Sequence, residues 1–278
     1  ILFNMPDFIY ILKFIILGFV QGFTEPLPIS SSGHLILFRE YFGVETTGLS
    51  FEIIVHFGSL IAIVIIYWKD IMTLINEGIR YLIHKEKQYA SSFRMIIYLL
   101  VATFITGVIG LFVEDYISDE LTKPVYVALA LLVTGVFVWM IRNLEGHKSD
   151  EDITMKEAII IGLAQTCALI PGISRSGATV VAAMLIGMKR ETSLRFSFLL
   201  AIPVILGTNV LSITDIAKDP LLEMNLIPYI VAFFVTFIAT YFALKWFINV
   251  MVKGKLAIFS IYCFIVGTGV IIHQIFFV

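Results

Sequence analysis

Charged side chains are scarce in this chain. Asp, Glu, Lys and Arg make up 14% of its 278 residues, whereas hydrophobic types make up 59%. A soluble domain usually carries about 25% charged and about 45–50% apolar residues, so a soluble fold could not bury this much apolar surface. The composition therefore predicts an integral membrane protein.

Concentrated positive charge and paired cysteines are also lacking. The formal net charge is −2, with no Lys/Arg-rich tract and no nucleic-acid motif, so no nucleic-acid partner is expected. Cys167 and Cys263, the two cysteines, both lie in apolar runs, and we expect them to stay reduced.

Long apolar runs supply the architecture. A helix needs about 17–25 residues to cross about 30 Å of hydrocarbon. Transmembrane β-strands would be shorter and would alternate polar with apolar positions, so helices are expected. Six runs are long enough, or nearly so, and they cover residues 51–68, 94–113, 124–142, 193–213, 227–248 and 257–277.

Two further apolar regions, residues 8–42 and 156–188, are interrupted by proline, glycine and serine. Each is expected to form two short helices joined by a polar loop, which is a re-entrant hairpin. Such backbone is tolerated at membrane depth only where protein or a cavity surrounds it. The expected fold is an all-α polytopic membrane protein with six transmembrane helices and two re-entrant helical hairpins, in one membrane domain over residues 1–278.

The two interrupted regions resemble each other at a constant offset of 144 residues, as ISSSG and ISRSG show. Interrupted helices at corresponding positions of two halves point to a binding site between them. We therefore predict an internal repeat, with one unit over about 8–142 and another over about 156–277. Because three spans separate the hairpins, the repeat should have inverted topology.

Lysines and arginines divide unequally between the two ends of the predicted bundle. Fourteen fall on one side, Arg175 falls in a hairpin tip, and the other side holds only Lys13, Arg39, Lys123 and Lys218. The positive-inside rule places the larger group in the cytoplasm, with residues 69–93 as a cytoplasmic loop. Both termini and the mouth of the first hairpin are then expected outside.

The first hairpin carries a carboxylate, hydroxyls and a histidine in the segment GFVQGFTEPLPISSSGH. Gln21 and Glu25 are four residues apart, so a helix places them on one face. Ser30 and Ser31 open the next helix, whose N-terminal N–H groups attract anions. His34 follows within a turn, close enough to exchange a proton with a hydroxyl or a phosphate oxygen.

The second hairpin, PGISRSGAT, adds the hydroxyls of Ser174, Ser176 and Thr179 around Arg175. Arginine binds phosphate bidentately and keeps its charge. Placing it at membrane depth costs about 2.5–3.5 kcal/mol, which a bound anion would offset. If both tips meet near the midplane, two helix N-termini, an arginine and several hydroxyls converge beside Glu25, which suits a diphosphate held by a metal.

Other interpretations compete at several of these positions. Serine and threonine in membrane helices often only bond backbone or pack helices together. Glu25 could be an ordinary buried partner of Arg175. Glu52, at the start of a span, fits an interfacial position as well as a functional one, and His56, one turn further, is interpreted as structural.

The motifs QGFTE, PISSSGH and PGISRSGAT resemble the signature segments of the undecaprenyl-diphosphate phosphatases of the bacitracin-resistance type. The Phe51–Glu52 pair also matches a family position, and length, hydropathy and motif order agree over essentially the whole chain. The chain departs from the family at Pro26, where an aromatic residue is common. Gln21 in place of glutamate removes one carboxylate, so any metal site must rely more on Glu25.

The resemblance implies removal of the terminal phosphate from undecaprenyl diphosphate in the bacterial inner membrane, which gives the monophosphate lipid carrier for cell-wall synthesis. It also implies magnesium or calcium as cofactor, with Glu25 as a metal ligand, and by analogy a homodimer. The expected catalytic residues are Ser31, His34, Glu25 and Arg175. The expected substrate-binding residues are Gln21, Ser30, Ser174, Ser176, Thr179 and Glu52.

Two mechanisms and one other function stay open at this point. The first mechanism is in-line phosphoryl transfer to Ser31, with His34 as general acid or base and Arg175 stabilising the phosphoryl oxygens. The second replaces the serine with a metal-activated water. Because broken inverted repeats are also a transporter design, a carrier for an anionic lipid or small anion without hydrolysis is the alternative. The site is expected to open to the outer face.

Overall fold

The computed structural model describes residues 5–43, 50–113, 119–212 and 222–277. Within these ranges the chain is almost entirely helical and forms no β-strand. Five described helices are long and apolar enough to cross a membrane, or six if the bent pair α3–α4 counts as one span. The predicted class, an all-α polytopic membrane protein, is confirmed.

The described α-helices differ widely in length, from 11 to 31 residues. In chain order they are α1 Met5–Thr24, α2 Ser31–Phe42, α3 Ser50–Ile66, α4 Trp68–His84, α5 Ala90–Val113, α6 Pro124–Ile141, α7 Met155–Thr166, α8 Arg175–Leu185, α9 Arg190–Leu211, α11 Leu222–Val252 and α12 Ala257–Phe277. Short 3-10 helices, η1 Lys87–Tyr89, η3 Asp119–Thr122, η4 Asp150–Asp152 and η5 Cys167–Leu169, lie in the connections.

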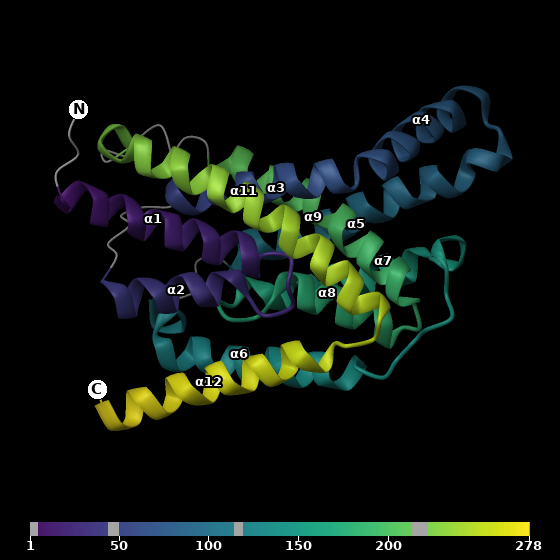
Figure 1. Cartoon of the computed structure of the whole chain (residues 1–278). Coiled ribbons are helices and arrows are strands. Elements are labelled where there is room, and N and C mark those ends of the chain that lie inside the picture. The colour runs from purple at the N-terminus through teal and green to yellow at the C-terminus, as the bar shows by residue number, and fades with distance from the viewer. Residues whose placement is uncertain (1–4, 44–49, 114–118, 213–221, 278) are drawn as a thin grey trace.

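The pairs α1–α2 and α7–α8 are the two expected hairpins, and they enter the bundle from opposite ends (Figure 1). Proline ends α1 because it lacks an N–H group, and both Pro26 and Pro28 follow Thr24. The helices after the two loops begin alike. Ser30 Oγ accepts a hydrogen bond from Gly33 N at 3.3 Å, and Ser174 Oγ accepts one from Gly177 N at 3.0 Å.

The first helix of each hairpin packs closely against a span from the other half of the chain. A Cβ added at Gly18 in α1 would lie 2.7 Å from the Ala232 oxygen of α11, and one at Gly162 in α7 would lie 2.9 Å from Ala102 of α5. Thr236 of α11 donates to the Gly18 carbonyl oxygen at 2.8 Å. These contacts interlock the two halves, while the exact limits of the repeat units stay a prediction.

Residues 69–93 are not the loop that the hydropathy suggested. The first span, α3, ends at Ile66, and the chain bends by 72° into α4. Charged residues interrupt the apolar run there, which lowers the hydropathy without preventing an amphipathic helix. In the same way α9 starts at Arg190 and α11 extends to Val252, beyond the apolar segments used to locate them.

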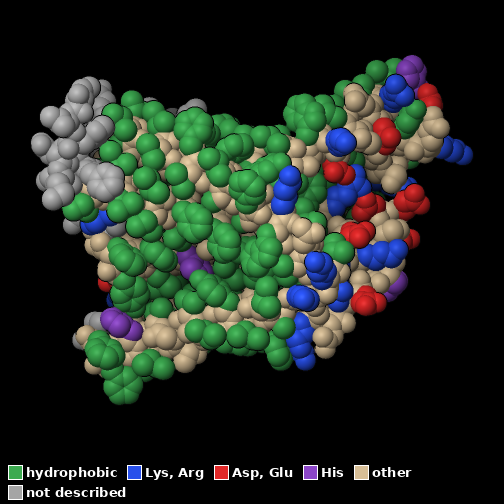
Figure 2. Space-filling view, in the orientation of Figure 1, with side chains coloured by type: hydrophobic (Ala, Val, Ile, Leu, Met, Phe, Trp, Pro, Cys, Tyr) green, Lys and Arg blue, Asp and Glu red, His purple; other side chains and the backbone are tan. Residues whose placement is uncertain are grey.

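Charged side chains gather at one end of the bundle. Figure 2 shows them at the end where α4 lies, away from the end where α1 begins and α12 finishes, and hydrophobic side chains cover the surface between. At the charged end Arg195 pairs with Asp70 at 2.7 Å and also with Asp150. This is the banded surface expected of a chain that spans a bilayer.

Candidate active site

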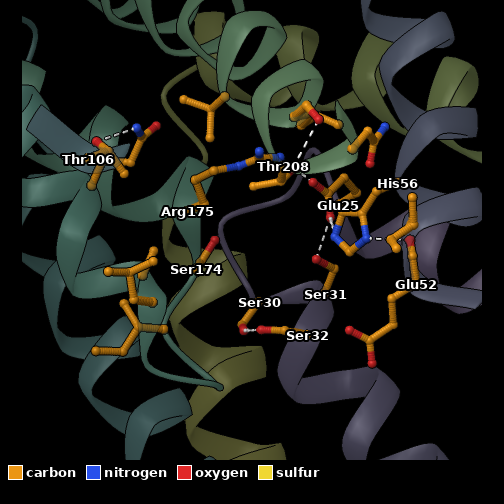
Figure 3. A pocket seen from close by; sticks show the side chains of 18 of the residues that line it. Glu25, Ser30, Ser31, Ser32, Glu52, His56, Thr106, Ser174, Arg175 and Thr208 are labelled. Atoms are coloured by element: carbon orange, nitrogen blue, oxygen red, sulfur yellow. Dashed lines mark hydrogen bonds and ion pairs between the residues drawn. The ribbon is translucent and has the colours of Figure 1, made fainter. Parts of the chain in front are cut away.

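The tips of the two hairpins meet at a cavity of about 290 Å³. Glu25 and Ser31 from the first hairpin, Arg175 from the second, and Glu52 and His56 from α3 point toward it (Figure 3). Residues more than one hundred positions apart in the sequence therefore form one polar site inside the helical bundle.

The second tip is fastened to the loop of the first. Ser176 Oγ and Ser174 Oγ both donate to the Leu27 carbonyl oxygen, at 2.9 and 3.3 Å. Gly172 has a φ of 97°, and a Cβ there would lie 2.6 Å from the Val127 oxygen of α6, so only glycine fits this turn. These contacts fix the N-terminus of α8 beside the N-terminus of α2.

Ser31 and Arg175 occupy the same place in the two hairpins. Each is the first residue of its helix, and each follows a capping serine, at the constant offset of 144 residues. They are the one position at which ISSSG differs from ISRSG. One repeat thus presents a hydroxyl, and the other a permanent positive charge, at the end of a helix whose dipole favours anions.

Glu25 joins these two residues. Its Oε2 accepts hydrogen bonds from Ser31 Oγ at 2.5 Å and from Gln21 Nε2 at 2.8 Å, and its Oε1 pairs with Arg175. The residue is only 7% exposed. A buried carboxylate needs such partners, because one left unpaired would cost several kcal/mol.

His56 completes this cluster, although the sequence favoured a structural role for it. Its Nδ1 donates to the Glu52 carbonyl oxygen at 2.7 Å, which leaves Nε2 to face Glu25 Oε2 at 3.6 Å. The sequence did contain a signal for this role: His56 lies four residues after Glu52, which belongs to a family motif, so a helix places both on one face.

His34 does not reach this cavity, contrary to the contact expected from its distance in sequence to Ser31. Its Nδ1 donates to the Ser30 carbonyl oxygen at 2.7 Å, and its Nε2 accepts from the Tyr262 hydroxyl at 2.8 Å. The ring stacks on Tyr262 and the residue is 3% exposed. Tyr262 lies on α12, so this contact directs the imidazole toward that helix instead of toward the cavity.

The other predicted residues lie at different depths. Ser30 and Ser174 line the main cavity. Ser176 and Thr179 line a narrow cleft behind Arg175. Gln21 is fully buried behind Glu25.

Comparison of the sequence with known proteins assigns the chain to a family. The model of the bacitracin resistance protein BacA family matches residues 14–269. The chain belongs to that family. It is 57% identical over 263 residues to undecaprenyl-diphosphatase 2 of Bacillus thuringiensis, covering 95% of this chain and 97% of the relative. It is 51% identical to undecaprenyl-diphosphatase 1 of Bacillus licheniformis, covering 96% of this chain and 99% of the relative.

Oxygen atoms dominate the groups in this BacA-family site that could hold a metal. Among the described residues no group of three or more His, Cys, Asp or Glu side chains is arranged to hold a metal ion by itself. The Glu25 carboxylate and the serine hydroxyls line the cavity, and Gln21 Oε1, buried behind Glu25, has no hydrogen-bond partner within the described part of the chain. Magnesium is usually held by one or two carboxylates together with substrate phosphates, so these donors fit a cation that binds with a diphosphate.

Glu52 contacts an arginine in this BacA-family structure. Its Oε1 accepts a hydrogen bond from Arg39 at 2.7 Å, across the edge of the cavity. The carboxylate is 35% exposed and forms no hydrogen bond or ion pair with Ser31 or Arg175. The structure therefore places Glu52 at the entrance, one step outside the cluster around Glu25.

Proposed function

We propose that this chain hydrolyses undecaprenyl diphosphate to undecaprenyl phosphate and inorganic phosphate, and so regenerates the lipid carrier for bacterial cell-wall synthesis. One observation carries the proposal: within a membrane protein, a serine contacts a carboxylate that also pairs with an arginine. These three groups supply a nucleophile, a base and a phosphate ligand. The names of the relatives support the same reaction. The carrier alternative is not favoured, because transport needs no nucleophile beside a base.

Ser31 carries out the first bond exchange. Its Oγ attacks the terminal phosphorus as its proton passes to Glu25, to which it is already hydrogen-bonded. The bond between that phosphorus and the bridging oxygen breaks, and undecaprenyl phosphate leaves. A water molecule then hydrolyses the phosphoserine and releases inorganic phosphate. Direct attack by water, with Ser31 as a positioning group, is the competing route.

Arg175 stabilises the charge that develops on the phosphoryl oxygens. In this structure it pairs with Glu25, and its other guanidinium N–H groups, which have no acceptor among the described residues, remain for phosphate. The N-termini of α2 and α8 add backbone N–H groups on the same side. Because these groups are held in place before the substrate arrives, little reorganisation is needed during the reaction.

His56, rather than His34, is proposed to exchange the proton. His56 Nε2 faces the Glu25 oxygen that bonds Ser31, so a proton accepted by Glu25 has a second acceptor at hand. His34 has both ring nitrogens engaged with Ser30 and Tyr262. Its proposed task is to hold the turn in which Ser30 caps α2.

A divalent cation, magnesium or calcium, is the proposed cofactor. Glu25 would hold it, with the unpartnered Gln21 Oε1 beside that carboxylate. When bound, such an ion neutralises phosphate charge and polarises a phosphoryl oxygen. Chelation by EDTA should abolish turnover, and added magnesium or calcium should restore it.

An apolar cavity suits the start of the isoprenoid chain. It measures about 180 Å³, lies between α6, α7 and α8, and shares Ile173 and Ser174 with the main cavity. Phe137, Val138 and Leu185 are among its lining residues. Ligand pockets usually measure about 300–1,000 Å³, so this one would take only the first isoprene units and leave the rest in the bilayer.

The proposed orientation has the termini and the cavity mouth outside the bacterial inner membrane. The end of the bundle rich in lysine and arginine then lies in the cytoplasm, as the positive-inside rule requires. The mouth lies beside Arg39 on α2, toward the end where α12 finishes. A homodimer is proposed by family analogy alone.

The direct test is phosphate release from undecaprenyl diphosphate by the purified protein in detergent. The wild type should release phosphate, and Ser31→Ala should lose about 10³-fold or more if the serine attacks. Arg175→Lys keeps the charge but loses the planar fork, so it should lose about 10²-fold. Ser92→Ala, in α5 at the charged end, is the matched control. Absence of release by folded wild-type protein would refute the proposed function.

A further inference from the structure

A second cavity adjoins the active site on its outer side. Its volume is about 740 Å³, and it extends along α2 and reaches Thr122 at the end of η3. It shares five lining residues with the main cavity: Ser32, Glu52, His56, Ala168 and Leu169. We call it the vestibule. A diphosphate entering from this side, or a phosphate leaving, would pass through it.

Arg39 is the one lysine or arginine among the described residues that line the vestibule, where Glu40 and Glu52 also lie. Two carboxylates would repel an anion that approaches the site. Arg39 lies on α2 and lines the vestibule together with Glu52, and its guanidinium lies over the Phe51 ring at 5.6 Å. The attraction of anions into this space therefore depends on a single side chain within the part of the chain described.

The hydrogen bonding of Arg39 is incomplete. NH1 donates to Glu52 at 2.7 Å, whereas Nε and NH2 are buried and have no acceptor among the described residues. Buried donors without acceptors are costly. Nε and NH2 form one edge of the guanidinium, which matches two oxygens of a phosphate group. If the guanidinium leaves Glu52, it can turn this Nε–NH2 edge toward a phosphate in the vestibule, and that contact would satisfy these donors.

We propose that Arg39 binds phosphate at the entrance of the site, and that the Glu52 carboxylate pairs with Arg39 when no phosphate is bound. A phosphate group in the vestibule displaces the Glu52 carboxylate and binds the Arg39 guanidinium. When the phosphate dissociates, the ion pair between Arg39 and Glu52 forms again. Glu52 thus competes with the ligand instead of binding it. The inference rests on the proposed function and gives Arg39 a part in substrate entry or phosphate exit.

Opposite substitutions in this pair should shift phosphate affinity in opposite directions. Arg39→Gln removes the charge and should weaken binding about tenfold, the usual scale for loss of a charged hydrogen-bonding group. Glu52→Gln removes the competing charge and should tighten binding by about three- to tenfold. A purely structural ion pair would not give this pattern, because breaking it from either side would loosen the same contact.

The test is titration of each purified variant in detergent, by calorimetry, with inorganic phosphate and separately with undecaprenyl phosphate. Arg142→Gln is the control. Arg142 follows the last residue of α6, at the end away from the vestibule, so this variant should bind phosphate like the wild type. Opposite shifts with either ligand support the proposal, and the ligand that shows them identifies free or lipid-linked phosphate as the occupant. Equal affinities, or weakening in both variants, would overturn it.

Two further points distinguish a loss of phosphate binding from a loss of folding or of turnover. Thermal unfolding is measured for every variant, and if Arg39→Gln does not fold, Arg39→Lys replaces it with a smaller expected weakening, because the charge stays and the fork is lost. The titrations need no turnover. A protein that binds phosphate with the expected opposite shifts but releases none from undecaprenyl diphosphate would refute the proposed function and leave phosphate binding by Arg39 supported.

Discussion

At the scale of single residues, Glu25 organises the site. It bonds the proposed nucleophile Ser31, pairs with Arg175 and faces His56, so one carboxylate positions three chemically different groups. Effects of substitutions within such a cluster should be strongly non-additive, because the members act as a unit.

The two histidines near Ser31 give contrasting predictions. His56→Gln removes the imidazole that faces Glu25 and should lower kcat by about 10²–10⁴-fold, the usual contribution of general acid–base catalysis. His34→Gln should instead lower the unfolding temperature and reduce kcat less than about tenfold, because His34 only bonds Ser30 and Tyr262. Phosphate release and thermal unfolding are measured on both variants.

The reverse result would restore the role expected from the sequence. A folded His34→Gln protein with its turnover lost, beside a His56→Gln protein with normal turnover, would show that His34, and not His56, exchanges the proton. A pH profile separates the cases further. The catalytic histidine should contribute an ionisation to kcat that disappears in its own variant.

At the scale of elements, glycines on α1 set the spacing of the bundle. A Cβ at Gly22 would lie 2.4 Å from the Thr236 oxygen and 2.9 Å from the Ala239 Cβ of α11. Neither backbone can yield without separating the two helices. The first hairpin, which carries Glu25 at the end of α1, is therefore positioned by backbone contact with a span from the other half of the chain.

Alanine substitutions at two glycines test this packing. Gly22→Ala should lower the free energy of unfolding by about 1–3 kcal/mol, as overpacking of a tight contact usually does. Gly107→Ala in α5 is the matched control, since nothing lies within 4 Å of its added Cβ, and it should be neutral or slightly stabilising. Equal unfolding temperatures for both variants in detergent would contradict the close α1–α11 contact.

At the scale of the whole molecule, the two hairpins divide one task. They enter from opposite ends, cap their second helices with Ser30 and Ser174, and bring Ser31 and Arg175 to the same cavity. An inverted repeat with a binding site at the interface of its halves explains why neither half could form the site alone.

The orientation in the membrane can be tested with single cysteines. Gln88 lies in η1 at the charged end, and Glu120 lies in η3 near the vestibule, both exposed. In a background without Cys167 and Cys263, an impermeant thiol reagent should label Glu120→Cys on intact cells and should label Gln88→Cys only after lysis. Labelling in the opposite order would invert the proposed topology.

Local sequence signals determined most of the architecture. Hydropathy located the membrane-spanning helices, and proline, glycine and serine located the hairpin loops, because solvation and helix breaking act on neighbouring residues. Hydropathy missed α4, whose apolar side chains are interspersed with charges. The motifs also placed Ser31, Glu25 and Arg175 in one candidate site, since a buried arginine and carboxylate need each other wherever they lie in the chain.

Only the tertiary structure decided which side chains face one another. Tyr262 lies 228 residues from His34 and donates a hydrogen bond to its Nε2, whereas α3 brings His56 to Glu25. Arg39 likewise forms an ion pair with Glu52, so in our proposal Glu52 competes with phosphate for Arg39. The sequence specifies each helix and its faces, but the partner of a face depends on how distant helices rotate and pack, and that is set by the interlocked halves as a whole.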